Sequence, residues 1–174
     1  MSQCPICDEL NSNKLTLYKG DGCTAILAKD AAVPGHALVV PNEHYPIIEM
    51  IPDFVLAEMV GIANKLSIAL FEGLKAQGTN IMIMNGPPAG QNLPHCVLEV
   101  IPRKEGDGLD MNWAPKQVSE DELVRIEETL KAEAKNIQPF EKTKKEPMVE
   151  EKKVTAKVVE DTGDLRIRHL RRIP

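Results

Sequence analysis

Residues 90–103 read Gly-Gln-Asn-Leu-Pro-His-Cys-Val-Leu-Glu-Val-Ile-Pro-Arg. A Gly-Gln pair typical of a tight turn precedes an apolar run, which predicts a β-strand from His95 to Ile101. Side chains of a strand alternate between two faces. One face therefore carries Cys96, Leu98 and Val100, and the other carries His95, Val97 and Glu99. The first set is apolar and belongs in a core, whereas the second is mixed, and we expect it to line a cleft.

The preceding sequence predicts the rest of an antiparallel sheet. An apolar strand over residues 80–84 leads into a Gly- and Pro-rich turn at 85–91, so this strand pairs with the one that begins at His95. Two further strands, TAILA and HALVVP, follow Asp21 and are separated by a loop that holds Pro34 and Gly35. Together these segments predict an antiparallel sheet.

Two helices are predicted around this sheet. The longer one opens at Pro52 and Asp53, carries apolar residues at helical spacing and closes at Gly78. The other begins at Ser119, with a glutamate three residues later in the arrangement of a capping box, and runs to about Lys135. We expect an α+β fold with an antiparallel sheet of about five strands, these two main helices against it, and a C-terminal extension.

Composition narrows the class of protein. A chain of 174 residues has the length of one domain with a short appendage. Its net charge of −5 argues against binding to nucleic acid or anionic membranes over the whole protein, because such binding needs a positive surface. The sequence shows no export signal or membrane span, so we expect a cytoplasmic protein whose four cysteines are thiols or metal ligands rather than disulfides.

The first cysteines form the motif Cys4-Pro5-Ile6-Cys7. This spacing is typical of zinc ligands, but a thioredoxin-type redox pair and an incidental pair of thiols are the alternatives. His44 and His95 each follow or begin a strand-like segment and are the candidates to complete a Cys2His2 set. Such a set leaves no open position for water, so it would stabilise the fold rather than catalyse a reaction.

Several spaced motifs resemble the histidine-triad (HIT) family. The run at 90–103 is similar to its signature, in which a Gly-Gln turn precedes His-x-His-x-His. Residues 34–44, PGHALVVPNEH, and 78–86, GTNIMIMNG, resemble further segments in the family's order, and the likeness spans roughly residues 4–135. The resemblance implies a HIT-like fold, one Zn²⁺ on Cys4, Cys7, His44 and His95, and a homodimer joined through the sheet and the long helix.

The sequence departs from the family pattern where the chemistry takes place. The resemblance puts the nucleophilic middle histidine at Val97, the third histidine at Glu99, and the acid or amide that contacts the ribose at Ala28. A hydrocarbon side chain cannot act as a nucleophile or a base. We therefore expect a zinc-stabilised relative of nucleotide hydrolases and transferases that is a non-catalytic nucleotide- or partner-binding module, with an active hydrolase or transferase of rearranged site as the alternative.

Other residues are candidates for ligand contacts. The resemblance puts Asn85, Gln91 and Asn92 in the turn that contacts phosphate, although tight turns favour these residues anyway. His36 is interpreted as a hydrogen-bonding strand residue near the site rather than a catalytic group. The Asn and Gln side chains keep a nucleotide or phosphate ligand among the expectations.

The C-terminal part changes in composition. We expect a HIT-like domain over residues 1–136, a linker rich in Lys and Glu over 137–153, and a basic hairpin or tail over 154–174. The basic side chains of the tail are Arg166, Arg168, His169, Arg171 and Arg172. They indicate either a solvated surface or a contact with an acidic protein or RNA, which makes an interaction protein the third functional hypothesis.

Overall fold

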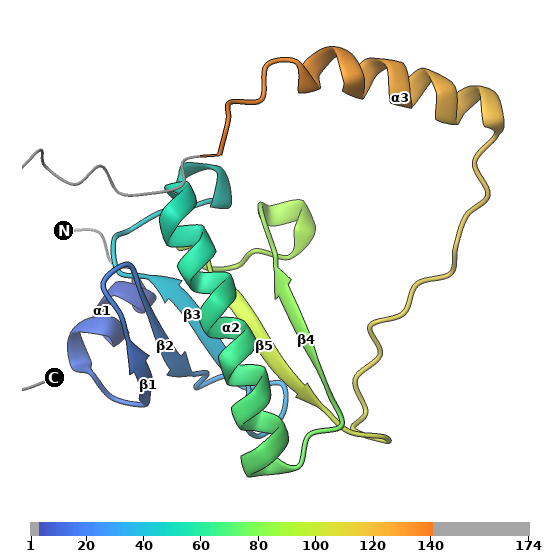
Figure 1. Ribbon diagram of the computed structural model, residues 1–174. Helices are drawn as coiled ribbons and strands as arrows, with labels where there is room; N and C mark the ends of the chain where they lie inside the picture. The colour runs from blue at the N-terminus through green and yellow to red at the C-terminus, as the bar shows by residue number, and fades with distance from the viewer. Residues whose placement is uncertain (1–3, 141–174) are drawn as a thin grey trace, which may run out of the picture. The chain divides into compact units, whose positions relative to one another are not determined.

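The computed structural model of the protein describes residues 4–140 and confirms the α+β fold with an antiparallel sheet of five strands. The strand order is β1-β2-β3-β5-β4, and every neighbouring pair is antiparallel (Figure 1). The strands are β1 (Thr16–Lys19), β2 (Cys23–Leu27), β3 (Ala37–Pro41), β4 (Gly78–Ile83) and β5 (Leu98–Arg103). The helices are α1 (Pro5–Ser12), α2 (Asp53–Leu74) and α3 (Glu120–Ala134), with short 3-10 turns η1 (Ile48–Met50) and η2 (Pro87–Ala89).

Helix α2 covers one face of the sheet and supplies five of the buried residues of the main core. Its buried residues recur at helical spacing and are Val55, Met59, Ile62, Ala63 and Leu70. The helix ends at Lys75, which adopts the left-handed conformation and donates its N–H to the Leu70 carbonyl. By length and composition alone α2 is apolar enough to cross a membrane. In this fold its buried apolar residues pack on strand residues such as Val39 and Val100.

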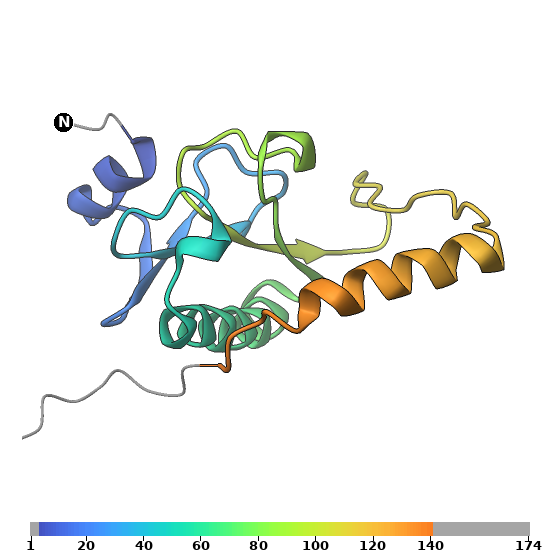
Figure 2. The same cartoon turned by 90° about the horizontal axis from the view of Figure 1, so that it is seen from above.

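Helix α1 lies on the opposite face of the sheet from α2 (Figure 2). Its Ile6 and the adjoining Cys4 form a second buried cluster with Val40 of β3. Alternation along β3 produces this division, because Val39 contributes to the core beneath α2 while Val40 points to the α1 side. The sheet is therefore covered by α2 on one face and, at one end of the other face, by α1.

The strand predicted from His95 begins three residues later, at Leu98. The Cys96 N–H donates to the Tyr45 carbonyl (2.6 Å), an acceptor in the loop after β3, so this segment is not paired as a strand. The predicted faces are nevertheless found: Cys96, Leu98 and Val100 are buried in the core, while Val97 and Glu99 are only partly buried. Pro94 and the loop contact delay the strand without changing the alternation.

Helix α3 begins where the capping pattern predicts, because the Ser119 hydroxyl accepts the Glu122 N–H (3.3 Å). The expectation that this helix packs against the sheet is wrong, since every residue of α3 is exposed. The physical reason is that charged side chains make up more than half of α3, so burying the helix would remove them from water. The apolar side chains Leu123, Val124, Ile126 and Leu130 of α3 are exposed.

Two elements have no counterpart among the predicted ones. Helix α1 spans only eight residues, too few for a periodic pattern, and β1 is a four-residue strand that is largely exposed. The predicted hairpin over 154–174 and the linker beyond residue 140 lie outside the described residues.

Candidate metal centre and adjoining cleft

The N-terminus of α1 places two thiols on the same side of the chain. Cys4 is the N-cap residue and Cys7 lies in the first turn, with Pro5 at the first helical position. The Asp8 N–H donates to the Cys4 carbonyl (3.1 Å), which closes that turn. A helix N-terminus carries partial positive charge and stabilises thiolates, so this position suits cysteines that bind a cation.

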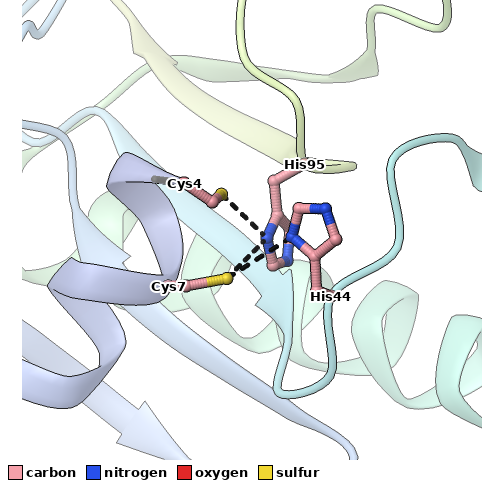
Figure 3. A group of neighbouring side chains, drawn as sticks. All are labelled: Cys4, Cys7, His44 and His95. Atoms are coloured by element: carbon pink, nitrogen blue, oxygen red, sulfur yellow. Dashed lines mark hydrogen bonds between the residues drawn. The ribbon is translucent and has the colours of Figure 1, made fainter. Parts of the chain in front are cut away.

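Two histidines bring their ring nitrogens to these thiols (Figure 3). The Cys7 Sγ lies 3.4 Å from His44 Nδ1 and 3.7 Å from His95 Nδ1, and the Cys4 Sγ lies 3.6 Å from His95 Nδ1. All four candidate ligand atoms lie within 4.8 Å of one another. In a zinc tetrahedron with bonds of about 2.3 Å to sulfur and 2.0–2.1 Å to nitrogen, sulfur and nitrogen are about 3.6 Å apart. The spacing therefore fits a tetrahedral metal ion.

The ring of His95 is oriented by the backbone. Its Nε2 lies 3.3 Å from the Pro41 carbonyl, and since a carbonyl accepts only, Nε2 carries the proton. The Nδ1 lone pair is then free for a metal, as is usual for a histidine ligand. Burial lowers the pKa of His95, which favours the neutral form that metal binding requires. The Pro41 carbonyl could not be foreseen as a partner from residue types, because it is a backbone group.

The cluster favours a metal centre over an isolated redox pair. Burial, together with the neighbouring Cys4, raises the pKa of the Cys7 thiol, so without a cation the thiolate is disfavoured. A divalent ion would reverse that preference, and the two imidazoles complete a closed set of four ligands. The residues present thus fit a structural metal ion held by Cys4, Cys7, His44 and His95.

A cleft of about 570 Å³ lies beside this cluster, on the α1 side of the sheet. Pro5, Ile6, Glu9 and other residues of α1 form part of its lining, and Val97 and Glu99 form another part. Most of the remaining lining comes from β2, β3 and the loop between them, including Ala28 and His36, and Lys14, Asn92 and Leu93 complete it. Of the mixed face predicted for His95, Val97 and Glu99, the last two therefore open on a cleft, whereas His95 is buried in the metal cluster.

His36 is the most enclosed polar residue of the cleft, with 6% of its surface exposed. Gly35, at a φ of 94°, turns the chain into it, a conformation that favours glycine. The His36 Nδ1 accepts the Ala32 N–H (3.2 Å), so in the neutral ring the proton is on Nε2. Burial lowers the pKa of His36 and raises that of Glu99. The His36 Nε2 lies 3.8 Å from Glu99 Oε2, too far for a hydrogen bond.

Comparison with known proteins decides the family. The HIT domain matches residues 9–106 of this chain, more than half of its length. The chain belongs to the HIT domain family. An adenylylsulfatase of Arabidopsis thaliana is 36% identical over 104 residues, which cover 60% of this chain and 51% of that protein. This chain therefore matches about half the length of that relative.

Other known proteins match over a larger share of their length. An uncharacterized HIT-like protein of Methanocaldococcus jannaschii is 31% identical over 125 residues, 70% of this chain and 96% of that protein. A structure from Streptococcus mutans has a TM-score of 0.71 at 26% identity and covers 77% and 87% of the two chains. A zinc-bound histidine triad family protein from Mycobacterium smegmatis has a TM-score of 0.58 at 27% identity and covers 78% and 98%.

The three residues at which the resemblance predicts a departure from the family pattern lie together in this HIT domain. Ala28, Val97 and Glu99 all line the cleft. The metal cluster, by contrast, keeps all four of its predicted residues within one group. The positions at which the resemblance predicted departures therefore lie around the cleft, and the four predicted metal ligands lie together beside it.

The turn residues of the HIT domain are divided between two sites. Asn92 lines the cleft. Asn85 instead accepts the Ile48 N–H (3.1 Å) and donates to Glu49 (2.7 Å), while Gln91 accepts the Gly86 N–H (2.8 Å) and donates to the Pro46 carbonyl (2.7 Å). These two amides fix the loop that follows His44. Glu9 and Lys29, which pair with each other, also line the cleft and were not among the predicted residues, because α1 was not predicted.

Proposed function

We propose that this HIT domain is a zinc-stabilised, non-catalytic binding module. The observation that supports it most directly is the side chain of Val97, which lines the cleft at the position of the family's nucleophilic histidine. An isopropyl group has no lone pair to attack phosphorus. Loss of a nucleophile typically lowers a rate by several orders of magnitude, or roughly 5 kcal/mol of transition-state stabilisation.

None of the three nearby histidine and cysteine side chains replaces this nucleophile in the cleft. His36 is the histidine that lines it, but its Nδ1 lone pair accepts the Ala32 N–H and its Nε2 carries the proton. Cys96 belongs to the core beneath α2, where burial, with Glu49 adding to it, raises the pKa of its thiol to about 11. His95 lies in the metal cluster. None of these groups presents a free lone pair to a bound phosphorus.

The competing function is a nucleotidyl hydrolase or transferase with a rearranged site. The names of two relatives support it: the Arabidopsis adenylylsulfatase and an adenosine 5'-monophosphoramidase of Saccharomyces cerevisiae, which is 30% identical over 109 residues. Such an enzyme would need His36 to release the Ala32 N–H and turn a nitrogen into the cleft. That rearrangement breaks the hydrogen bond between the Ala32 N–H and His36 Nδ1, which opposes it.

The decisive experiment is a turnover assay of the purified, metal-loaded protein. Adenosine 5'-phosphoramidate, adenylylsulfate and dinucleoside polyphosphates are the substrates, and the yeast monophosphoramidase is the positive control. We expect no turnover above that of the Val97→Ala variant in any of the three. Turnover that copurifies with the protein and is abolished by His36→Ala would instead establish the rearranged enzyme.

We also propose that the module is a homodimer. The outer surface of α2 exposes Val60, Ile68, Phe71 and Leu74, each with 46% or more of its surface accessible. Strand β4 is an edge strand with no partner on its outer side within residues 4–140, and its Ile81 is also exposed. An unpaired edge beside an exposed apolar helix surface favours association with a second copy.

A further inference from the structure

We propose that the cleft binds a small molecule with a protonated amine on an aliphatic body, and that Glu99 accepts the ammonium group. This inference rests on the proposed function, in which the cleft binds a ligand without reacting with it. It adds the chemical class of that ligand, which differs from the phosphate-bearing ligands expected from the family pattern.

The first support is the state of the Glu99 carboxylate. Only 18% of this side chain is exposed, and within residues 4–140 no donor lies within hydrogen-bond distance of it. The side-chain atoms that are both sealed from solvent and unpartnered do not include the Glu99 oxygens. Both of these oxygens therefore remain reachable from the cleft. A mostly enclosed carboxylate without donors is unfavourable until a ligand supplies them.

The second support is the enclosed imidazole behind this carboxylate. His36 is 6% exposed, and its Nε2 is sealed from solvent with no hydrogen-bond partner among the described residues. The nitrogen that carries this proton lies 3.8 Å from Glu99 Oε2. A small shift of Glu99 would bring it within hydrogen-bond distance of this N–H, leaving its other oxygen for a ligand. His36 is therefore a positioning residue for Glu99.

The third support is the charge of the lining. It carries four acidic side chains and two basic ones, namely Asp8, Glu9, Asp30 and Glu99 against Lys14 and Lys29. Lys29 is already paired with Glu9. The excess of negative charge attracts a cation and repels a phosphate, and the effect is stronger on the partly buried Glu99 than at the exposed rim.

The fourth support is the shape of the apolar lining. Around Glu99 the cleft presents aliphatic side chains, including Ile6, Leu38, Leu93 and Val97, and within residues 4–140 no Phe, Tyr or Trp lines it. Such walls bury an alkyl chain through the hydrophobic effect, and they provide no aromatic ring for cation–π contacts or stacking. A carboxylate beside aliphatic walls is the complement of an alkyl ammonium.

The test compares three probes with one alkyl chain and different head groups. Hexylamine, hexanol and hexyl phosphate are titrated at neutral pH into the full-length, metal-loaded protein, and binding is measured from backbone amide shifts by NMR. We expect hexylammonium to bind about tenfold more tightly than hexanol, as befits a charge-assisted hydrogen bond, and hexyl phosphate to bind most weakly.

Two variants and one control locate the effect. Glu99→Gln keeps the shape and removes the charge, so it should lower the affinity for hexylamine about tenfold and leave hexanol within twofold. Val97→Leu, which fills the cleft, should weaken hexylamine and hexanol together. Glu105→Gln, an exposed acid outside the cleft lining, should change neither. Metal content and circular dichroism establish that each variant is folded.

The outcomes separate this inference from the proposed function. Hexyl phosphate binding as tightly as hexylamine, or hexylamine binding that Glu99→Gln does not weaken, would overturn the amine-binding inference. Neither result bears on catalysis, which the turnover assay measures independently. An amine preference that depends on Glu99 would support the inference whether or not that assay detects turnover.

Discussion

At the scale of single residues, this HIT domain has a histidine that can bind a metal but, two residues later, no histidine that could act as a nucleophile. His95 is held by the Pro41 carbonyl so that Nδ1 faces two thiols, and it serves the metal cluster. Two residues later, Val97 lines the cleft. The segment before β5 therefore keeps a metal-binding group and lacks a reactive one.

Removal of one thiol should release the metal. We expect Cys7→Ser to lower bound zinc from about one ion per chain to a small fraction, because a three-ligand site loses a strong bond. The thermal midpoint should fall as well, since metal binding energy contributes to folding energy. Metal analysis and thermal unfolding measure the two effects.

Cys96→Ala is the matched control for that experiment. Cys96 is buried in the core and lies outside the metal cluster. The Cys96→Ala variant should lose some stability and keep its zinc. Equal zinc content in Cys7→Ser and the wild-type protein would contradict the assignment.

The buried carboxylate predicts an unusual pH dependence. Burial raises the pKa of Glu99 in the folded protein, so the folded state binds more protons than the unfolded state in the window above the ordinary glutamate pKa. Stability contributed by this group therefore falls as the pH rises through that window. Glu99→Gln removes the charge, and we expect it to be more stable than the wild type at pH 7.

Thermal unfolding between pH 4 and pH 8 measures this difference. The advantage of Glu99→Gln should shrink as the pH falls below the ordinary pKa of glutamate, where both states of the wild type are protonated. His36, whose pKa burial lowers, lies 3.8 Å from Glu99, so its titration also contributes to the difference below neutral pH. A variant that is less stable at pH 7 would show that the carboxylate has a donor in solution.

At the scale of elements, α2 holds the sheet together and α1 completes the functional side. Met59 of α2 is fully buried, whereas Val60, the next residue, is half exposed. We expect Met59→Ala to lower the free energy of unfolding by about 2–4 kcal/mol, because it leaves a cavity in the core. Val60→Ala should change it by less than about 1 kcal/mol in the monomer. Denaturant unfolding measures both, and equal losses would contradict the packing.

The success of prediction from sequence differed between elements for physical reasons. Helix α2 and strands β2 to β5 are long or strongly apolar, so their periodicity and turn residues indicate them. Helix α1 was missed although both of its thiols were recognised, because eight residues carry little periodic signal. Helix α3 was located by its cap at Ser119, but a cap contains no information on what the helix packs against.

The site was predictable in the same uneven way. Cys4, Cys7, His44 and His95 could be grouped because metal ligands reveal themselves by residue type and spacing. The pairing of Glu9 with Lys29 in the cleft depends on the unpredicted α1, and the distance between His36 and Glu99 depends on how β3 and β5 pair. Such contacts between distant segments are set by tertiary structure rather than by local pattern.

At the scale of the whole molecule, the exposed surface of α2 predicts the oligomeric state. We expect Phe71→Glu, which puts a charge on the most exposed apolar residue of that helix, to convert the proposed dimer into a monomer. Light scattering after size-exclusion chromatography measures the mass. Lys65→Glu, also on an exposed position of α2, tests whether charge alone has this effect. A wild-type protein that elutes as a monomer at all concentrations would exclude the dimer.

The position of the metal cluster between three segments of the chain has a further consequence. The metal cluster joins the start of α1 to the chain after β3 and to the segment before β5, and two of these three pieces also form walls of the cleft. Chelation would therefore let those walls separate, although no metal ligand lies in the cleft lining. Apparent affinities for any small molecule should consequently track zinc occupancy, and a screen run in chelating buffer would overlook genuine ligands.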